Sequence, residues 1–282
     1  MKFLHSSDIM LPGYFGIHTI QFQVIMRYID AKLYTGGGKP IWEILFLKLH
    51  GREVDAASEK CLQDDFIYFI DRMKQNGFHP ELSKIELAEQ PILWIFNGTH
   101  RVGYLFTQIP NFFIPVNFVP AAPWGITNGA TYLRSIGLPE DMLNELLRAY
   151  NEIYSKMRRT ITGVMDSKIF NENSAKIAEE LGAFGKMFFL DAKNISLPKN
   201  NDMWRDKLSI SGNNATVIFM NINRETLYIK DGEIYSYEVD GISNHFNELF
   251  GKNWGYISHT ITESIMLEEY LNKTCVDKKN NE

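Results

Sequence analysis

The segment that most constrains the fold is a short apolar run that ends in an asparagine–glycine turn and leads directly into a helix. The run spans residues 92–96, Asn97 and Gly98 form the turn, and apolar spacing predicts a helix over residues 102–108. A strand followed at once by a helix indicates a fold of mixed sheet and helices. The first amides of such a helix have no partner inside it, and the helix dipole favours negative charge there. The turn is therefore a natural anion site.

The residues of this turn are candidate binding side chains. They are Asn97, Gly98, Thr99, His100 and Arg101. Arg101 can clasp a phosphate group with two N–H donors, and His100 is also a candidate catalytic residue. The segment predicts phosphate or nucleotide binding without naming a reaction. The alternative is an ordinary strand–helix turn, with Thr99 as the helix N-cap and Arg101 on the surface.

Composition narrows the classes of protein that the chain can belong to. Its 282 residues are 45% hydrophobic, which is enough for one large or two modest domains. The net charge of -5 argues against a DNA-coating protein and against nucleic acid as the partner. Cys61 and Cys275 lie far apart without a CxxC pattern, so neither a disulfide framework nor a metal site is expected.

The sequence also predicts where the protein works. No run approaches the roughly 20 apolar residues that a membrane-spanning helix needs. The first residues include an early acid, Asp8, and no long apolar core, so they do not resemble a signal peptide. We therefore expect a cytoplasmic protein without a membrane span; the oligomeric state stays open.

Periodicity and turn residues divide the chain into two expected domains. Residues 1–122 read as a helical lead-in followed by a compact unit, and residues 123–282 as a mixture of helices and β-hairpins. The boundary is the Ala-, Pro- and Gly-rich segment 120–128. Helices are expected at residues 20–33, 41–49, 65–76, 139–158, 173–181 and 262–272, and strands at 84–88, 92–96, 112–119, 186–191, 216–221, 226–230 and 233–239.

Two glycines have specific structural interpretations. Gly77 follows the expected helix 65–76 and is well suited to cap its C-terminus. Gly103 is expected to let its helix pack closely on the sheet. The order of elements from residue 65 to 119 is helix, strand, strand, helix, strand, which predicts an α+β class.

This order, together with the Gly98-Thr99-His100-Arg101 motif, resembles the ParB/sulfiredoxin-like fold. That family carries a glycine–basic motif, D-G-x-H-R or G-C-H-R, at a strand–turn–helix junction that holds nucleotide phosphates. The resemblance covers roughly residues 64–119. Proteins of similar layout are associated with cell-surface polysaccharide synthesis. The resemblance therefore implies bound ATP or another nucleoside triphosphate, Mg²⁺, and a small-molecule or glycan-precursor acceptor.

Differences from the family pattern separate its branches. Sulfiredoxins need a cysteine where this chain has Thr99, so repair of sulfinic acids is not expected. The chromosome-partition branch, which binds DNA, fits poorly with the acidic charge and the β-rich C-terminal half. The free-serine kinase branch has the motif D-G-H-H-R, in which Gly98, His100 and Arg101 match.

The kinase interpretation leaves one catalytic group unassigned. Asn97 replaces the family's acid, and an amide cannot take a proton from an acceptor hydroxyl. Glu53 and Asp55 are the nearest upstream acids, so they are the candidate catalytic carboxylates; their alternative is a solvated turn. We expect a nucleotide-dependent kinase, and the competing hypothesis is a non-catalytic nucleotide-binding module or a nucleotide hydrolase switch.

Overall fold

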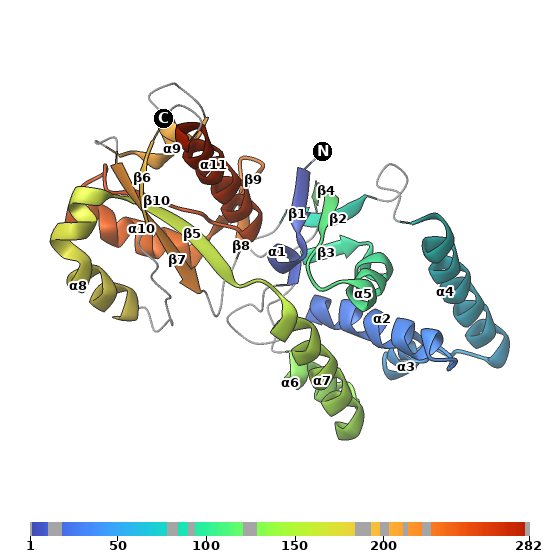
Figure 1. The fold of residues 1–282 in the computed structure, drawn as a ribbon. Coiled ribbons are helices and arrows are strands. Elements are labelled where there is room, and N and C mark those ends of the chain that lie inside the picture. Colours follow the sequence, from blue (N-terminus) through green and yellow to red (C-terminus); the bar gives the residue numbers. More distant parts are fainter. Residues whose placement is uncertain are drawn as a thin grey trace. The chain divides into compact units, whose positions relative to one another are not determined.

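The chain forms two compact units, Met1–Met157 and Arg158–Glu282 (Figure 1). The computed structural model describes residues 2–10, 19–77, 84–89, 94–120, 129–183, 193–197, 203–210, 214–221 and 227–279. Both units combine helices with a sheet, so the expected α+β class is confirmed. The division falls after Met157 and not after residue 122, because the helices that follow residue 128 contact the first unit.

The first unit is built on a four-stranded sheet. Its elements in chain order are β1 (Lys2–His5), α1 (Ser6–Met10), α2 (Thr19–Thr35), α3 (Trp42–Leu49), α4 (Ala56–Asn76), β2 (Ile85–Glu89), β3 (Trp94–Asn97), α5 (Thr99–Gln108), β4 (Phe113–Pro120), α6 (Gly129–Ser135) and α7 (Glu140–Lys156). The strand order is β1-β4-β2-β3, with β2 parallel to β4 and the other pairs antiparallel. The sequence pattern did not predict β1, which forms the edge beside β4.

Helix α4 begins and ends at residues whose chemistry favours those positions. The Asp55 side chain accepts a hydrogen bond of 2.7 Å from the Ser58 amide and so caps the helix start. Gly77 follows the last turn with φ of 73°, a conformation that costs glycine little. The expected cap at Gly77 is confirmed, but the helix starts earlier than the predicted residue 65. One face of α4 packs Phe66 and Ile70 against Ala31 of α2 and Tyr104 of α5.

Helices α2 and α5 contact each other at Gly103. A Cβ at this position would lie 2.6 Å from Arg27 Cβ and 2.9 Å from the Tyr28 amide nitrogen. Only glycine allows the two backbones to approach this closely. The predicted close packing of Gly103 is therefore real, but its partner is α2 and not the sheet.

The second unit has its own sheet with helices on both faces. Its elements are β5 (Thr160–Asp166), α8 (Ser167–Ala183), β6 (Lys193–Ser196), α9 (Met203–Leu208), β7 (Asn214–Asn221), β8 (Leu227–Lys230), β9 (Glu233–Ser236), α10 (Tyr237–Phe250), β10 (Gly255–Ile257) and α11 (Ile261–Lys279). The four-stranded sheet has the order β10-β5-β7-β6 and is antiparallel throughout, while β8 and β9 form a separate hairpin.

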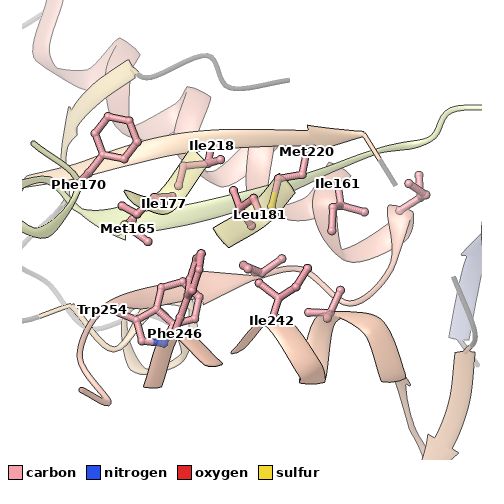
Figure 2. Close-up of a cluster of buried hydrophobic side chains, with 13 residues drawn as sticks. Ile161, Met165, Phe170, Ile177, Leu181, Ile218, Met220, Ile242, Phe246 and Trp254 are labelled. Atoms are coloured by element: carbon pink, nitrogen blue, oxygen red, sulfur yellow. The ribbon is translucent and has the colours of Figure 1, made fainter. Parts of the chain in front are cut away.

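Alternate residues of the central strands point to opposite faces of this sheet. Ile161 and Met165 of β5 belong to a core with α8 and α10, shown in Figure 2, in which Phe246 and Trp254 also lie. Val164 of β5 belongs to a second core with α9 and α11. Because both faces are covered, β5 is buried along nearly its whole length and lacks the alternation of polar residues that marks a half-exposed strand.

One predicted strand of the second unit is wrong in its second half. The run 233–239 was expected to be a single strand, but β9 ends at Ser236. The Ser236 hydroxyl accepts a hydrogen bond from the Val239 amide and caps α10, so the local cap overrides the β propensity of the following residues. The hairpin expected at Asp231-Gly232 is confirmed, and the strand expected at 186–191 lies outside the described residues.

Candidate functional site

The turn at Gly98 has a geometry that only glycine fits. Gly98 has φ of 106° and ψ of 14°, which is the left-handed region, and it precedes the first residue of α5. A Cβ there would lie 2.4 Å from Ile85 Cδ1 and 3.1 Å from Arg101 Nη2. The sequence prediction of a strand–turn–helix junction is thus confirmed, and the space beside Gly98 is taken by the Arg101 guanidinium.

The start of α5 leaves backbone donors available. The first amide to donate along the helix is that of Val102, to the Gly98 carbonyl, and Gly98 has no side chain that could cap the preceding amides. Thr99 is the first residue inside the helix and is buried, so it is not the N-cap that the alternative interpretation expected. These amides and the helix dipole favour an anion at this position.

Arg101 folds back onto the turn and does not extend into solvent. Its Nη1 donates a hydrogen bond of 3.2 Å to the Lys84 carbonyl. Burial lowers the pKa of Arg101, while the charge of Glu86 opposes the shift. One hydrogen bond uses only part of a guanidinium group that carries five N–H donors, so Arg101 keeps capacity for an anion at the turn.

Asn97 is the last residue of β3 and pairs with Glu86 of β2. It is exposed at the turn. Its position matches the expectation that it would flank an anion site, and its amide could donate to one but not act as a base.

His100 contacts a carboxylate from a helix that is distant in sequence. His100 Nε2 lies 3.4 Å from Oε2 of Glu43 in α3. The His100 ring also lies against Phe66 and Phe69 of α4, with centroid distances of 5.6 and 6.0 Å. The histidine predicted from the motif is therefore held between a carboxylate and two aromatic rings.

The same carboxylate binds a buried arginine. Arg27 Nη2 of α2 lies 2.7 Å from Glu43 Oε1, and the Arg27 side chain is only 11% exposed. Burial opposes ionisation of Glu43, but the hydrogen bond with His100 and the charge of Arg27 outweigh it and lower its pKa. Glu43 is therefore a carboxylate at neutral pH, fixed from both sides by cationic or hydrogen-bonding groups.

Asp30 completes this cluster from one turn further along α2. Its Oδ1 accepts hydrogen bonds from the amides of Ile41 and Trp42, at 2.7 and 3.0 Å, and so holds the start of α3. Its Oδ2 is 3.9 Å from Arg27 Nη1, which is longer than a hydrogen bond. Asp30 Oδ2 and the Nε and Nη1 atoms of Arg27 are buried without a hydrogen-bond partner. Burial raises the pKa of Asp30 despite the two amide donors.

Glu53 and Asp55, the two carboxylates expected to be catalytic, lie elsewhere. Both are exposed in the segment between α3 and α4, and Asp55 is used as the N-cap of α4. A backbone hydrogen bond from Ser58 lowers the pKa of Asp55. Within the described residues, the acid that contacts the motif is Glu43. Its signal in the sequence is a lone carboxylate inside the otherwise apolar run 41–49.

The second unit contains a comparable polar cluster around Glu263 of α11. Glu263 Oε1 accepts hydrogen bonds from the Tyr256 hydroxyl and from Lys207 Nζ, the latter at 3.0 Å, and Oε2 accepts from the His259 amide at 2.8 Å. The Ser236 amide donates to His259 Nδ1 at 3.4 Å. Burial lowers the pKa of His259, although Glu263 and Asp240 oppose the shift.

Comparisons with protein-family models, with curated proteins and with solved structures gave no match. Across the part of the chain that the structure describes, no group of three or more His, Cys, Asp or Glu side chains is arranged to hold a metal ion. No helix among those residues has the length and apolar character to cross a membrane. The candidate site therefore stands on its own geometry.

Proposed function

We propose that the protein is a phosphotransferase that moves a phosphoryl group from ATP, or another nucleoside triphosphate, to the hydroxyl of a small molecule or glycan precursor. The observation that carries this proposal is the hydrogen bond between Glu43 and His100 at the uncapped start of α5. Phosphoryl transfer to a hydroxyl needs an anion site next to a group that can accept the hydroxyl proton. This arrangement offers both.

The turn fits a phosphate group in three respects. The amides of residues 99–101 supply backbone donors, the missing Cβ of Gly98 lets an oxygen approach, and Arg101 supplies positive charge. Mg²⁺ would then be held chiefly by the nucleotide phosphates, because the described side chains offer no cluster of three ligands. When bound, the ion would neutralise charge on the transferring group.

Glu43 is the group we assign as the proton acceptor. Arg27 and His100 each take one of its oxygens, yet a carboxylate has about four acceptor positions, so it can still bind a substrate hydroxyl. Its lowered pKa keeps it ionised at neutral pH. Glu43 would thus fill the role that Asn97 cannot, and His100 would position the carboxylate.

A second candidate function is a non-catalytic nucleotide-binding module or a hydrolase switch in surface-polysaccharide synthesis. Its support is the hydrogen bond of Arg101 to the Lys84 carbonyl, which gives this arginine a structural task at the turn. Incubation with Mg²⁺ and ATP, CTP or GTP separates the two. Consumption that depends on an acceptor supports a phosphotransferase, consumption without one indicates a hydrolase, and binding alone indicates a module.

The site assignment is tested by Arg101→Ala. We expect calorimetry to show loss of nucleotide binding, because the variant removes the only cation at the turn among the described contacts. Arg72→Ala is a matched control, since Arg72 lies on the exposed side of α4 against Tyr68. If Arg101→Ala binds ATP with unchanged affinity, the turn is not the phosphate site.

A further inference from the structure

A shallow pocket lies beside Glu43, between α2, α3 and α4. Its empty volume is about 180 Å³, and its walls include apolar side chains such as Ile44, Leu62 and Phe66. The polar side chains that line it are Asp30, Glu43 and Gln63. A pocket of this size suits a ligand of only a few heavy atoms, or one end of a larger molecule.

The polar groups in this pocket are acceptors. Asp30 Oδ2 is fully buried and accepts no hydrogen bond, although Asp30 lines the pocket. The Gln63 amide nitrogen donates to the Pro40 carbonyl at 3.0 Å, so its oxygen is the group left to face a ligand. A buried acceptor without a donor costs free energy, and a ligand that brings donors removes that cost.

The charge of the lining favours the same kind of ligand. Asp30 and Glu43 are both acids, and Arg27, which lies near them, is not among the residues that line the pocket. A carboxylate or phosphate on the ligand would meet acceptor oxygens and no cation. An ammonium group would instead gain charge-assisted hydrogen bonds.

The pocket borders the candidate site through two shared residues. Glu43 lines the pocket and contacts His100, and the Phe66 ring lines the pocket and lies 5.6 Å from the His100 ring. A ligand in the pocket is therefore adjacent to the carboxylate that we assign as the proton acceptor.

We propose that this pocket binds the acceptor substrate and that the acceptor is a small alcohol that carries an ammonium group and no anionic group. The proposal rests on the proposed function. The ammonium group donates to Asp30 Oδ2 and the Gln63 oxygen, and the hydroxyl donates to Glu43. The hydroxyl oxygen bonds to the γ-phosphorus of ATP, the bond from that phosphorus to the β–γ bridging oxygen breaks, ADP leaves, and the hydroxyl proton passes to Glu43.

Three two-carbon alcohols test the chemical class with the full-length protein. Ethanolamine carries an ammonium group, ethylene glycol a second hydroxyl, and glycolate a carboxylate. We expect ethanolamine to bind most tightly in NMR titrations without nucleotide, glycolate not to bind, and phosphorus NMR with Mg²⁺ and ATP to show phosphorylated ethanolamine. Ethanolamine binding no tighter than that of glycolate overturns the proposal.

Asp30→Asn tests the contact itself. The variant keeps an oxygen to accept from the Ile41 and Trp42 amides but replaces Oδ2 with a donor. We expect ethanolamine affinity to fall at least about tenfold, the effect of losing a hydrogen bond to a charged group. Glu59→Gln is the matched control, because Glu59 is an exposed acid on α4 that pairs with Lys48. An unchanged affinity in Asp30→Asn, with its fold checked by circular dichroism, contradicts the assignment.

The outcomes also separate this proposal from the proposed function. Ethanolamine binding that depends on Asp30, without nucleotide binding or phosphoryl transfer, supports the pocket assignment and contradicts the phosphotransferase. Phosphorylation of glycolate in preference to ethanolamine supports a phosphotransferase and contradicts the acceptor class.

Discussion

Glu43 of the first unit and Glu263 of the second are both partly buried carboxylates surrounded by donors, but their surroundings differ. Glu263 accepts from Lys207, Tyr256 and the His259 amide, so its charge is matched within the fold. Around Glu43, buried atoms of Arg27 and Asp30 have no hydrogen-bond partner. A saturated cluster stabilises a fold, whereas a cluster with unused donors and acceptors retains capacity for a ligand.

The largest expected effect tests this contrast directly. Glu43→Gln removes the proposed proton acceptor, and we expect phosphoryl transfer to fall by about 100- to 1,000-fold, in the range for loss of general base catalysis. Glu263→Gln should leave the turnover number unchanged, because Glu263 serves the second unit. Both rates are measured on protein whose fold is verified by circular dichroism. Equal losses in the two variants would show that the contrast between the clusters has no functional meaning.

A second test concerns the backbone on which the first cluster depends. Gly98→Ala should destabilise the first unit by about 3 kcal/mol, since it combines left-handed strain with overpacking against Ile85. Gly77→Ala is the control within the same unit: φ is 73° there but the space is open, so the cost should be about 1 kcal/mol. Urea titrations followed by hydrogen exchange at α5 amides measure both. Similar losses would show that crowding at Gly98 is unimportant.

The smallest expected effect is a pH dependence that belongs to the second unit. Burial holds the pKa of His259 below its ordinary value of 6.5, so the folded state excludes a proton that the unfolded chain takes up. Stability should be constant above about pH 6.5 and fall as the pH drops below it. Hydrogen exchange of β10 amides at pH 5.5 and 7.5 measures the change. His259→Gln should reduce this dependence, and an identical profile in that variant would exclude His259 as its source.

The sequence predicted those parts of the site that depend on neighbours along the chain. The Gly98 turn, the uncapped start of α5 and the cap at Gly77 follow from local backbone chemistry. The contact of Glu43 with His100 joins residues 57 positions apart and could not be read from spacing. Glu53 and Asp55 were chosen because they are near in sequence to a turn, but Asp55 is used to cap α4.

The same distinction explains the fold. Strands with one exposed face show alternation and were predicted, whereas β5 is covered on both faces and shows none. Helix α10 was partly read as strand because Tyr237 and Val239 favour β structure, and the Ser236 cap decides otherwise. Tertiary covering and a single capping hydrogen bond outweighed propensity in these two places.

The contact at Gly103 has a consequence for how this site could change. Because α5 meets α2 backbone to backbone, the distance from the His100 motif to Arg27 and Asp30 does not depend on the size of any intervening side chain. The pocket's other walls come from α3, α4 and the segment before α3. Substitutions there could alter which molecule is accepted while the phosphate turn keeps its alignment with α2. Gly103 thereby separates the tuning of specificity from the preservation of catalytic geometry.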